Sequence, residues 1–262
     1  MDKLTEELLE KVRKNFNERC ARHPNIQRVE KSVLAGKADL IDVELYSGSL
    51  GSQLALALMD CIDFKEFPNE RLYYELAKDL LGETLKTNYE LVNAAAAEVL
   101  KTLDNSVRYK LKIKPQKPKF PTDRVNKVAK SVCDPTVPQS TIERRLTYPI
   151  ENISESFYTD FVKENADFRA RSGVETYIVR KDGGNCCEWC AKLAGKYPYG
   201  DEPKDVYRRH DNCTCTVTFE NGRQRQNVWT KATWTADEDT LEKRKEFAEK
   251  KPTVLKPGGQ EN

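Results

Sequence analysis

Hydrophobic residues recur at helical spacing through most of the first hundred positions, with charged residues between them. The clearest run follows Asn69, which we expect to cap the amino end of a helix. The apolar positions of this run are Leu72, Leu76, Leu80, Leu85, Tyr89, Val92, Val99 and Leu103. Such a stripe is typical of a helix that packs against other helices, and a groove for a membrane or a partner is the alternative. Turn signals at Pro24, 47–51 and 67–69 divide the region into several helices.

The helical pattern breaks at residues 111–121, where Pro115, Pro118 and Pro121 follow one another at intervals of three. This spacing favours an extended path of the polyproline type, as in a linker or in an arm that lies on another surface. Basic side chains dominate the segment and its continuation, against the single acid Asp123. They are Lys110, Lys112, Lys114, Lys117, Lys119, Arg124, Lys127 and Lys130. Such a run can hold phosphates with an affinity that depends on salt, and a solvated linker is the alternative.

Helical periodicity resumes at 141–173, and Gly173 is placed to end that helix. Its candidate core positions are Ile153, Phe157, Phe161 and Phe168. The segment 174–181 alternates apolar and polar residues and is rich in β-branched side chains, which predicts a strand. A second strand is expected in 213–220, followed by a turn at Asn221 and Gly222.

These patterns predict an α+β protein, with a mainly helical amino-terminal body followed by a small β-containing module stapled by zinc. We expect five regions along the chain. They are a helical region at 1–110, a Pro- and Lys-rich linker or arm at 111–121, a helical region at 122–173, a metal-binding α+β module at 174–236 and a charged tail at 237–262.

Composition narrows the classes of function. The 44 basic and 42 acidic side chains nearly cancel, so any contact with nucleic acid has to be local. The first sixteen residues mix acids and bases with leucines, as in an amphipathic helix and unlike a signal peptide. No apolar run of about 18 residues occurs, so we expect no membrane span. Synthesis in the cytoplasm keeps thiols reduced, and there clustered cysteines indicate a metal more than disulfides.

Five of the eight cysteines and one of the two histidines lie close together in the sequence. They are Cys186, Cys187, Cys190, His210, Cys213 and Cys215. Tetrahedral zinc takes four nitrogen or sulfur ligands, commonly as two close pairs from two segments. Cys187 and Cys190 form the first pair, and His210 with Cys213 forms the second. Since alternate residues of a strand share a face, Cys215 is a further candidate. Cys186 is set aside, because adjacent side chains seldom serve one tetrahedral site.

The alternative to a metal is disulfides or thiols packed as small hydrophobic groups. A disulfide contributes about 2–4 kcal/mol, whereas a structural zinc site in a small peptide contributes roughly 10–16 kcal/mol of coupled binding and folding. A small module with few aliphatic side chains needs the larger contribution. A zinc deaminase carries His-x-Glu before Cys-x-x-Cys, and here the histidine follows that pair. The sequence also lacks the common hydrolase and phosphate-binding motifs, so we expect no enzyme.

Three segments together are similar to a known family. They are ENADFRARSG at 164–173, VRKDGGNCCEWCAKLAGKYPY at 179–199 and RRHDNCTCTV at 208–217. Over roughly 150–235 the chain resembles the carboxy-terminal half of tailed-phage minor head proteins, the Mu F-like head morphogenesis group of phages and prophages. Cys187 and Cys190 match the first cysteine pair of the group, and Leu193 with Gly195 matches its LxG motif. His210, Cys213 and Cys215 match its last motif. Asp211 stands where many members have proline.

The resemblance implies a virion protein that is made in the host cytoplasm and acts in a few copies near the portal during head assembly. Its partners would be the portal, the major capsid protein and, in one variant, packaged DNA. The alternative is a zinc-stapled protein that binds nucleic acid. The side chains proposed for that role are Lys112, Lys114, Lys117, Lys119, Arg223 and Arg225. A third class, a phage-borne nuclease or toxin-like effector, has no recognisable active site in the sequence.

Overall fold

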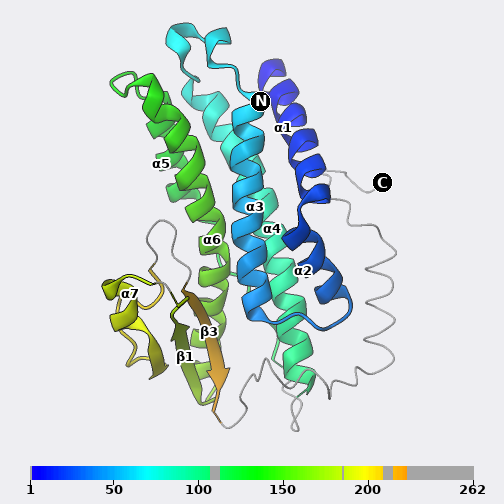
Figure 1. Cartoon of the computed structure of the whole chain (residues 1–262), viewed down its shortest axis with the longest axis vertical. Helices are drawn as coiled ribbons and strands as arrows, with labels where there is room; N and C mark the ends of the chain where they lie inside the picture. The colour runs from blue at the N-terminus through cyan, green and yellow to red at the C-terminus, as the bar shows by residue number, and fades with distance from the viewer. Residues whose placement is uncertain (1, 107–112, 185, 209–214, 223–262) are drawn as a thin grey trace.

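The computed structural model describes residues 2–106, 113–184, 186–208 and 215–222, and it shows a long helical bundle with a small sheet beside one end (Figure 1). The helices are α1 (Lys3–Arg22), α2 (Pro24–Leu34), α3 (Leu40–Cys61), α4 (Tyr74–Ser106), α5 (Thr122–Cys133), α6 (Gln139–Arg171) and α7 (Glu188–Leu193), with 3-10 turns at Phe64–Glu66 and Pro68–Glu70. The strands are β1 (Thr176–Lys181), β2 (Gly195–Pro198) and β3 (Thr216–Asn221). The expected α+β class is confirmed.

Capping side chains and a proline determine where the amino-terminal helices begin and end. The Asp2 carboxylate accepts a hydrogen bond from the Thr5 amide at 2.8 Å and caps α1. As the proline turn signal predicts, α1 ends before Pro24, which opens α2. At the start of α3, Asp39 and Asp42 form a reciprocal capping box at 2.9 and 3.1 Å. Charge and side-chain chemistry therefore fix where these helices begin.

The turn predicted at 47–51 is wrong, because this stretch lies inside α3. Helix α3 packs against α6 along its length, and the two glycines of the stretch face that helix. A Cβ on Gly51 would stand 2.8 Å from the Cβ of Ser154, and Ser47 donates a hydrogen bond to the Ser154 carbonyl at 2.5 Å. The small residues permit a close helix crossing and do not form a turn.

The apolar run after Asn69 forms α4 as predicted, but Asn69 does not cap it. Asn69 has a φ of 55° and lies within the 3-10 turn at Pro68–Glu70, while α4 begins at Tyr74. Of the eight predicted core positions in this run, all but the half-buried Leu103 are buried. The turn predicted at 67–69 is confirmed. Helix α4 starts later than expected, because a residue with a positive φ is not part of a right-handed helix.

The segment 113–121 takes an extended path and is bound to the helical body. Its Gln116 backbone exchanges two hydrogen bonds of 2.8 Å with the buried side chain of Asn165 on α6. The Pro118 carbonyl accepts a hydrogen bond from the Tyr89 hydroxyl on α4, and the ring of Phe120 packs edge-on against Tyr89. The segment therefore follows the surface between α4 and α6.

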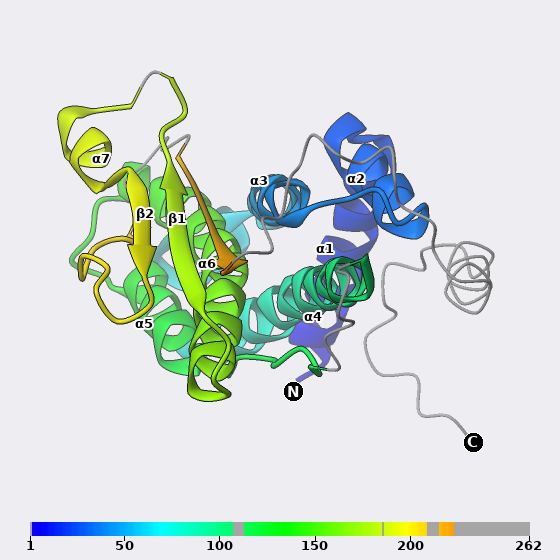
Figure 2. The same cartoon turned by 90° about the horizontal axis from the view of Figure 1, so that it is seen from below.

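The sheet has the order β2-β1-β3 with both pairs antiparallel, and it lies against the carboxy-terminal part of α6 (Figure 2). The glycine that the sequence places at the helix end is confirmed: Gly173 has a φ of 80° and turns the chain from α6 toward β1. The Tyr158 hydroxyl on α6 donates a hydrogen bond of 2.9 Å to the Val217 carbonyl of β3.

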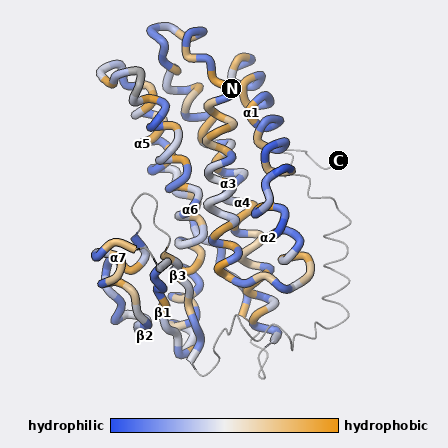
Figure 3. Tube along the Cα trace, viewed as in Figure 1, coloured by the Kyte–Doolittle hydropathy of each residue, from blue (hydrophilic) through white to orange (hydrophobic). Residues whose placement is uncertain are grey.

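One hydrophobic core runs from the helices into the sheet, and it includes Ile178, Val206, Val217 and Phe219 together with the leucines of α3 and α4. In Figure 3 the hydrophobic colour is concentrated on helix faces that meet other helices, for example along α3. Within the described ranges, no helix combines the length and apolar character needed to cross a bilayer.

Candidate metal centre

The chain reverses directly after β1 and so carries the first cysteines back over the sheet. The Asp182 carboxylate accepts a hydrogen bond from the Gly184 amide at 3.2 Å, and Gly184 has a φ of 84°. Glycine adopts this backbone conformation without strain, which explains the glycine at position 184. The reversal places Cys186 and Cys187 at the start of α7.

Cys187 and Cys190 occupy the first turn of α7. Cys187 is the N-cap residue, and its sulfur accepts a hydrogen bond from the Cys190 amide at 3.5 Å. Cys187 is exposed, whereas Cys190 is fully buried. Within one helical turn, one thiol thus faces solvent and the other faces the interior of the module.

The second candidate segment is described only in part. Cys215 lies directly before β3 and is buried. Val217, two residues further on, is the cross-strand partner of Arg180 in β1, so Cys215 lies on the same sheet face as Arg180. His210 and Cys213 lie outside the described residues.

A buried arginine connects the two segments. The Nη2 atom of Arg180 donates to the sulfur of Cys190 at 3.4 Å, and its Nη1 atom donates to the carbonyls of Val206 and Arg208 at 2.5 and 2.8 Å. Arg180 is only 1% exposed, and its guanidinium lies 5.7 Å from the ring centre of Trp189 on α7. One side chain therefore contacts both α7 and the turn at 206–208.

The environment of Cys186 differs from that of its neighbour. Partial desolvation raises the pKa of the Cys186 thiol, and the negative charges of Asp182 and Cys215 raise that pKa further. Cys186 is therefore within electrostatic reach of Cys215, although the sequence sets it aside as a ligand.

Three further cysteines lie in the helical body, where they pack as small hydrophobic groups. Burial raises the pKa of Cys20 to about 12 and that of Cys133 to about 11, and burial also raises the pKa of Cys61. Such thiols are poor nucleophiles and poor metal ligands at neutral pH. The cysteines of the body and those of the module therefore have different roles.

Among the residues that the structure describes, no three His, Cys, Asp or Glu side chains gather closely enough to hold a metal ion. Two of the five proposed ligands, His210 and Cys213, are outside that set. The described geometry supplies a paired Cys187 and Cys190, and sulfur atoms that accept N–H hydrogen bonds. Both features suit thiolate ligands.

The proposed nucleic-acid residues divide into three groups. Lys114 and Lys119 are exposed on the segment 113–121. Lys117 pairs with Glu90 and lies 5.0 Å from the ring centre of Tyr89, so its charge is partly neutralised. The remaining candidates, Lys112, Arg223 and Arg225, lie outside the described residues. On α5, which follows the segment, the predicted basic run continues with exposed side chains at Arg124, Lys127 and Lys130.

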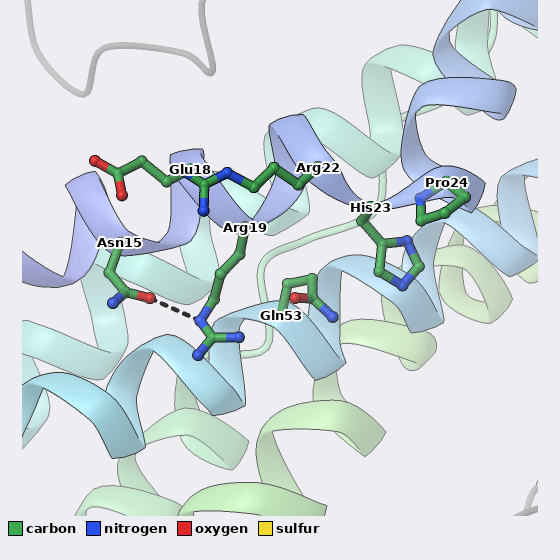
Figure 4. Close-up of a pocket in the computed structure, with 7 residues that line it drawn as sticks. All are labelled: Asn15, Glu18, Arg19, Arg22, His23, Pro24 and Gln53. Atoms are coloured by element: carbon green, nitrogen blue, oxygen red, sulfur yellow. Dashed lines mark hydrogen bonds between the residues drawn. The ribbon is translucent and has the colours of Figure 1, made fainter.

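A polar hollow between α1 and α3 lies far along the chain from the cysteines (Figure 4). It is lined by Asn15, Glu18, Arg19, Arg22, His23, Pro24 and Gln53. Arg19 is held by Asn15 at 2.7 Å and by Asp60, so its charge already has partners within the protein.

Arg180 is the residue of this centre that the sequence reasoning missed. The sequence of the predicted strand 174–181 does indicate that Arg180 is buried, because Arg180 lies two residues after Ile178. Ile178 is fully buried, and alternate strand residues share a face, so an arginine at the next position on that face must be buried and needs partners.

Comparison of the chain with protein-family models, curated proteins and solved structures finds no match.

Proposed function

We propose that this chain is a minor head protein of a tailed phage, a structural component that acts near the portal during head assembly and holds a structural zinc ion. In this proposal the chain catalyses no reaction. It is made in the host cytoplasm and becomes part of the virion, with the portal or the major capsid protein as its partner.

The observation that carries the proposal is the ordered motif set together with the placement of its first half. Cys187 and Cys190 lie in one turn at the edge of the sheet, and Cys215 enters the sheet on the face of Arg180. Arg180 itself donates to the Cys190 sulfur and to the carbonyls of Val206 and Arg208, so the first half of the motif is joined to the segment 206–208.

A zinc ion bound here would supply a rigid link between α7 and the amino end of β3. The residues proposed to hold it are Cys187, Cys190, His210 and one of Cys213 and Cys215. Within the described residues the module has three short strands and a six-residue helix, and its sheet packs on the core of the helical body, so the ion would add a link between α7 and β3 to that packing. The chain's own contribution is to orient the sulfurs, through the α7 amides and Arg180.

The helical body suits protein contacts. Long helices α3, α4 and α6 form a core that needs no metal, so they can keep a docking surface in shape. The exposed large hydrophobic side chains on this body, such as Leu45, Leu56 and Tyr148, are scattered on its surface. We propose that the body docks on the head and that the zinc module fixes the shape of a second contact surface.

The test uses particles from a phage genome that carries this gene. We expect the chain in purified particles at a few copies, and we expect Cys190→Ser to reduce its incorporation or the infectivity of the particles. Cys133→Ser, which changes a cysteine of the body, is the matched control and is expected to behave as wild type. Absence of the wild-type chain from particles, or normal incorporation and infectivity of a zinc-free Cys190→Ser chain, would contradict the proposal.

Nucleic-acid binding is the second candidate. The observation that favours it is a row of exposed basic side chains along 113–130, with Lys114 and Lys119 on the extended segment and Lys127 and Lys130 on α5. A row of this kind contacts phosphates with little dependence on base sequence. In a phage head the packaged DNA would be the ligand.

A further inference from the structure

Helix α3 exposes an apolar side to solvent. Leu45 and Leu56 are 39% and 43% exposed, and because they lie about three helical turns apart, they project from the same side of the helix. Ile41 and Met59, about one turn beyond them at either end, are half-buried on that side. We call these four side chains the α3 face. Since the solvent side of a bundle helix is ordinarily polar, the α3 face is suited to a protein contact.

Helices α1 and α6 border the α3 face on opposite sides (Figure 1 and Figure 2). On the α6 side, a Cβ on Gly51 would stand 3.1 Å from the Cα of Glu151. On the α1 side, Gln53 lines the hollow of Figure 4 together with Arg19 and Arg22. Gly51 and Gln53 belong to the same turn of α3, so Glu151 and Arg22 lie at the same level of the bundle.

The charges on the two borders are complementary. Arg22 is exposed and Glu151 is half-buried, and neither forms an ion pair with any residue that the structure describes. Arg19 differs from Arg22, because Asn15 and Asp60 already hold its guanidinium. An apolar centre with charged side chains at its rim is the usual composition of a protein–protein interface.

We propose that the α3 face is the interface of a homodimer, in which the two α3 helices pair in parallel about a two-fold axis. In such an isologous interface, Leu45 and Leu56 each meet their own copies. The α1 border of one protomer then lies over the α6 border of the other, so Arg22 faces Glu151 of the second copy in two symmetric ion pairs. The inference concerns how the chain associates and goes beyond the proposed function.

The direction of the pairing follows from the charges. An antiparallel arrangement would place α1 over α1 and α6 over α6, so like charges would face each other at a cost in affinity. The centre of the face allows a close approach, because Gly48 and Ser52 lie between the two leucines and are small. A second copy therefore supplies both the apolar surface and the charges that match this face.

Analytical ultracentrifugation of the full-length chain measures the dissociation constant of the dimer. We expect a dimer in the wild type, and we expect Leu56→Asp to weaken it about 30-fold or more, because this change places two carboxylates in the apolar interface. Leu4→Asp is the matched control. Leu4 is 48% exposed on α1 but lies outside the α3 face, so its replacement should leave the dissociation constant unchanged.

Charge reversal tests the parallel arrangement. Arg22→Glu and Glu151→Lys should each weaken the dimer about 10-fold, because each change places like charges opposite one another at both symmetric positions. An equimolar mixture of the two variants should recover the dimer, since a heterodimer has opposite charges at both positions. Far-ultraviolet circular dichroism reports whether each variant is folded. If Glu151→Lys does not fold, Leu56→Asp and Leu4→Asp carry the test.

A wild-type chain that stays monomeric at about 0.1 mM would overturn the inference. A folded Leu56→Asp chain with the wild-type dissociation constant would overturn it as well, because the dimer would then use another surface. If Leu56→Asp weakens the dimer but the mixture of charge variants does not recover it, the parallel arrangement is wrong. These results do not depend on metal content or on incorporation into particles, which test the proposed function.

Discussion

At the scale of single residues, two buried arginines join parts of the chain that are distant in sequence. Arg169 on α6 pairs with Asp104 at the end of α4 at 2.5 Å, and its guanidinium lies 5.3 Å from the ring centre of Phe219 in β3. Arg180 makes the corresponding connection inside the module. Breaking a buried pair of this kind by removing one partner costs about 3–5 kcal/mol. Arginine is usually a surface residue, and composition alone indicates neither position.

Two glycines in helix interiors, Gly51 and Gly82, differ in the space that the packed neighbours leave for a side chain. Gly51 faces Ser154 and the backbone of Glu151 at 3.1 Å, so an added methyl group has no room. Gly82 in α4 has nothing within 4 Å of the position that a Cβ would take. In the sequence each glycine follows a leucine and precedes a polar residue, and the packing of α3 on α6 is what distinguishes them.

We therefore predict opposite effects of the same substitution. Gly51→Ala should lower the free energy of unfolding by about 1–2 kcal/mol, because overpacking costs about 1–3 kcal/mol and the gain in helix propensity is at most about 1 kcal/mol. Gly82→Ala, the matched control, should raise it by about 0.5–1 kcal/mol. Denaturant unfolding followed by circular dichroism measures both. If Gly51→Ala raised the free energy of unfolding, the close packing of α3 on α6 at this position would be contradicted.

At the scale of elements, long periodic segments could be predicted and short ones could not. The pattern of leucines predicts α4, which buries one face, and the β-branched run predicts β1, in which Thr176 and the consecutive residues 178–180 are buried. Helix α7 and strand β2 have six and four residues, too few for a period to show. The spacing of Cys187 and Cys190 indicates a pair of ligands, but it does not reveal that Cys187 caps a helix that contains Cys190.

The segment 113–121 tests the nucleic-acid candidate. Its backbone is fixed by Asn165 and Tyr89, so Lys114 and Lys119 are held on the surface of the helical body, and Lys127 and Lys130 are exposed on α5, which follows. If these four side chains contact phosphates, replacing all of them by glutamine should change the slope of log affinity against log salt concentration. The slope should become less negative by about three to four units. Fluorescence anisotropy measures the affinity for duplex DNA at several salt concentrations between low and moderate salt, and these affinities give the slope.

The control for this experiment carries the same change in net charge elsewhere. Four exposed lysines of α1 and α4 are replaced by glutamine, namely Lys3, Lys14, Lys86 and Lys101. This control should keep the wild-type slope. No DNA binding at low salt, or the same slope in both quadruple variants, would exclude the segment and α5 as a phosphate-binding surface.

At the scale of the whole molecule, the helices and the sheet share one core. Ile178, Val217 and Phe219 belong to the same hydrophobic cluster as the leucines of α3, and Tyr158 binds the β3 backbone. The sequence predicts the order of the long helical regions and of the strands β1 and β3, because these segments show local periodicity. It does not predict how the sheet docks on α6, because docking depends on long-range contacts such as the hydrogen bond from the Tyr158 hydroxyl to the Val217 carbonyl.

The central claim is that one zinc ion joins two segments of this chain, and elemental analysis of the purified full-length protein tests it most directly. The account predicts about one zinc per chain in the wild type and its loss in Cys187→Ser and Cys190→Ser. Cys186→Ser, at the adjacent position, should keep the metal. A folded wild-type chain without zinc, or equal zinc content in all four proteins, would contradict the claim.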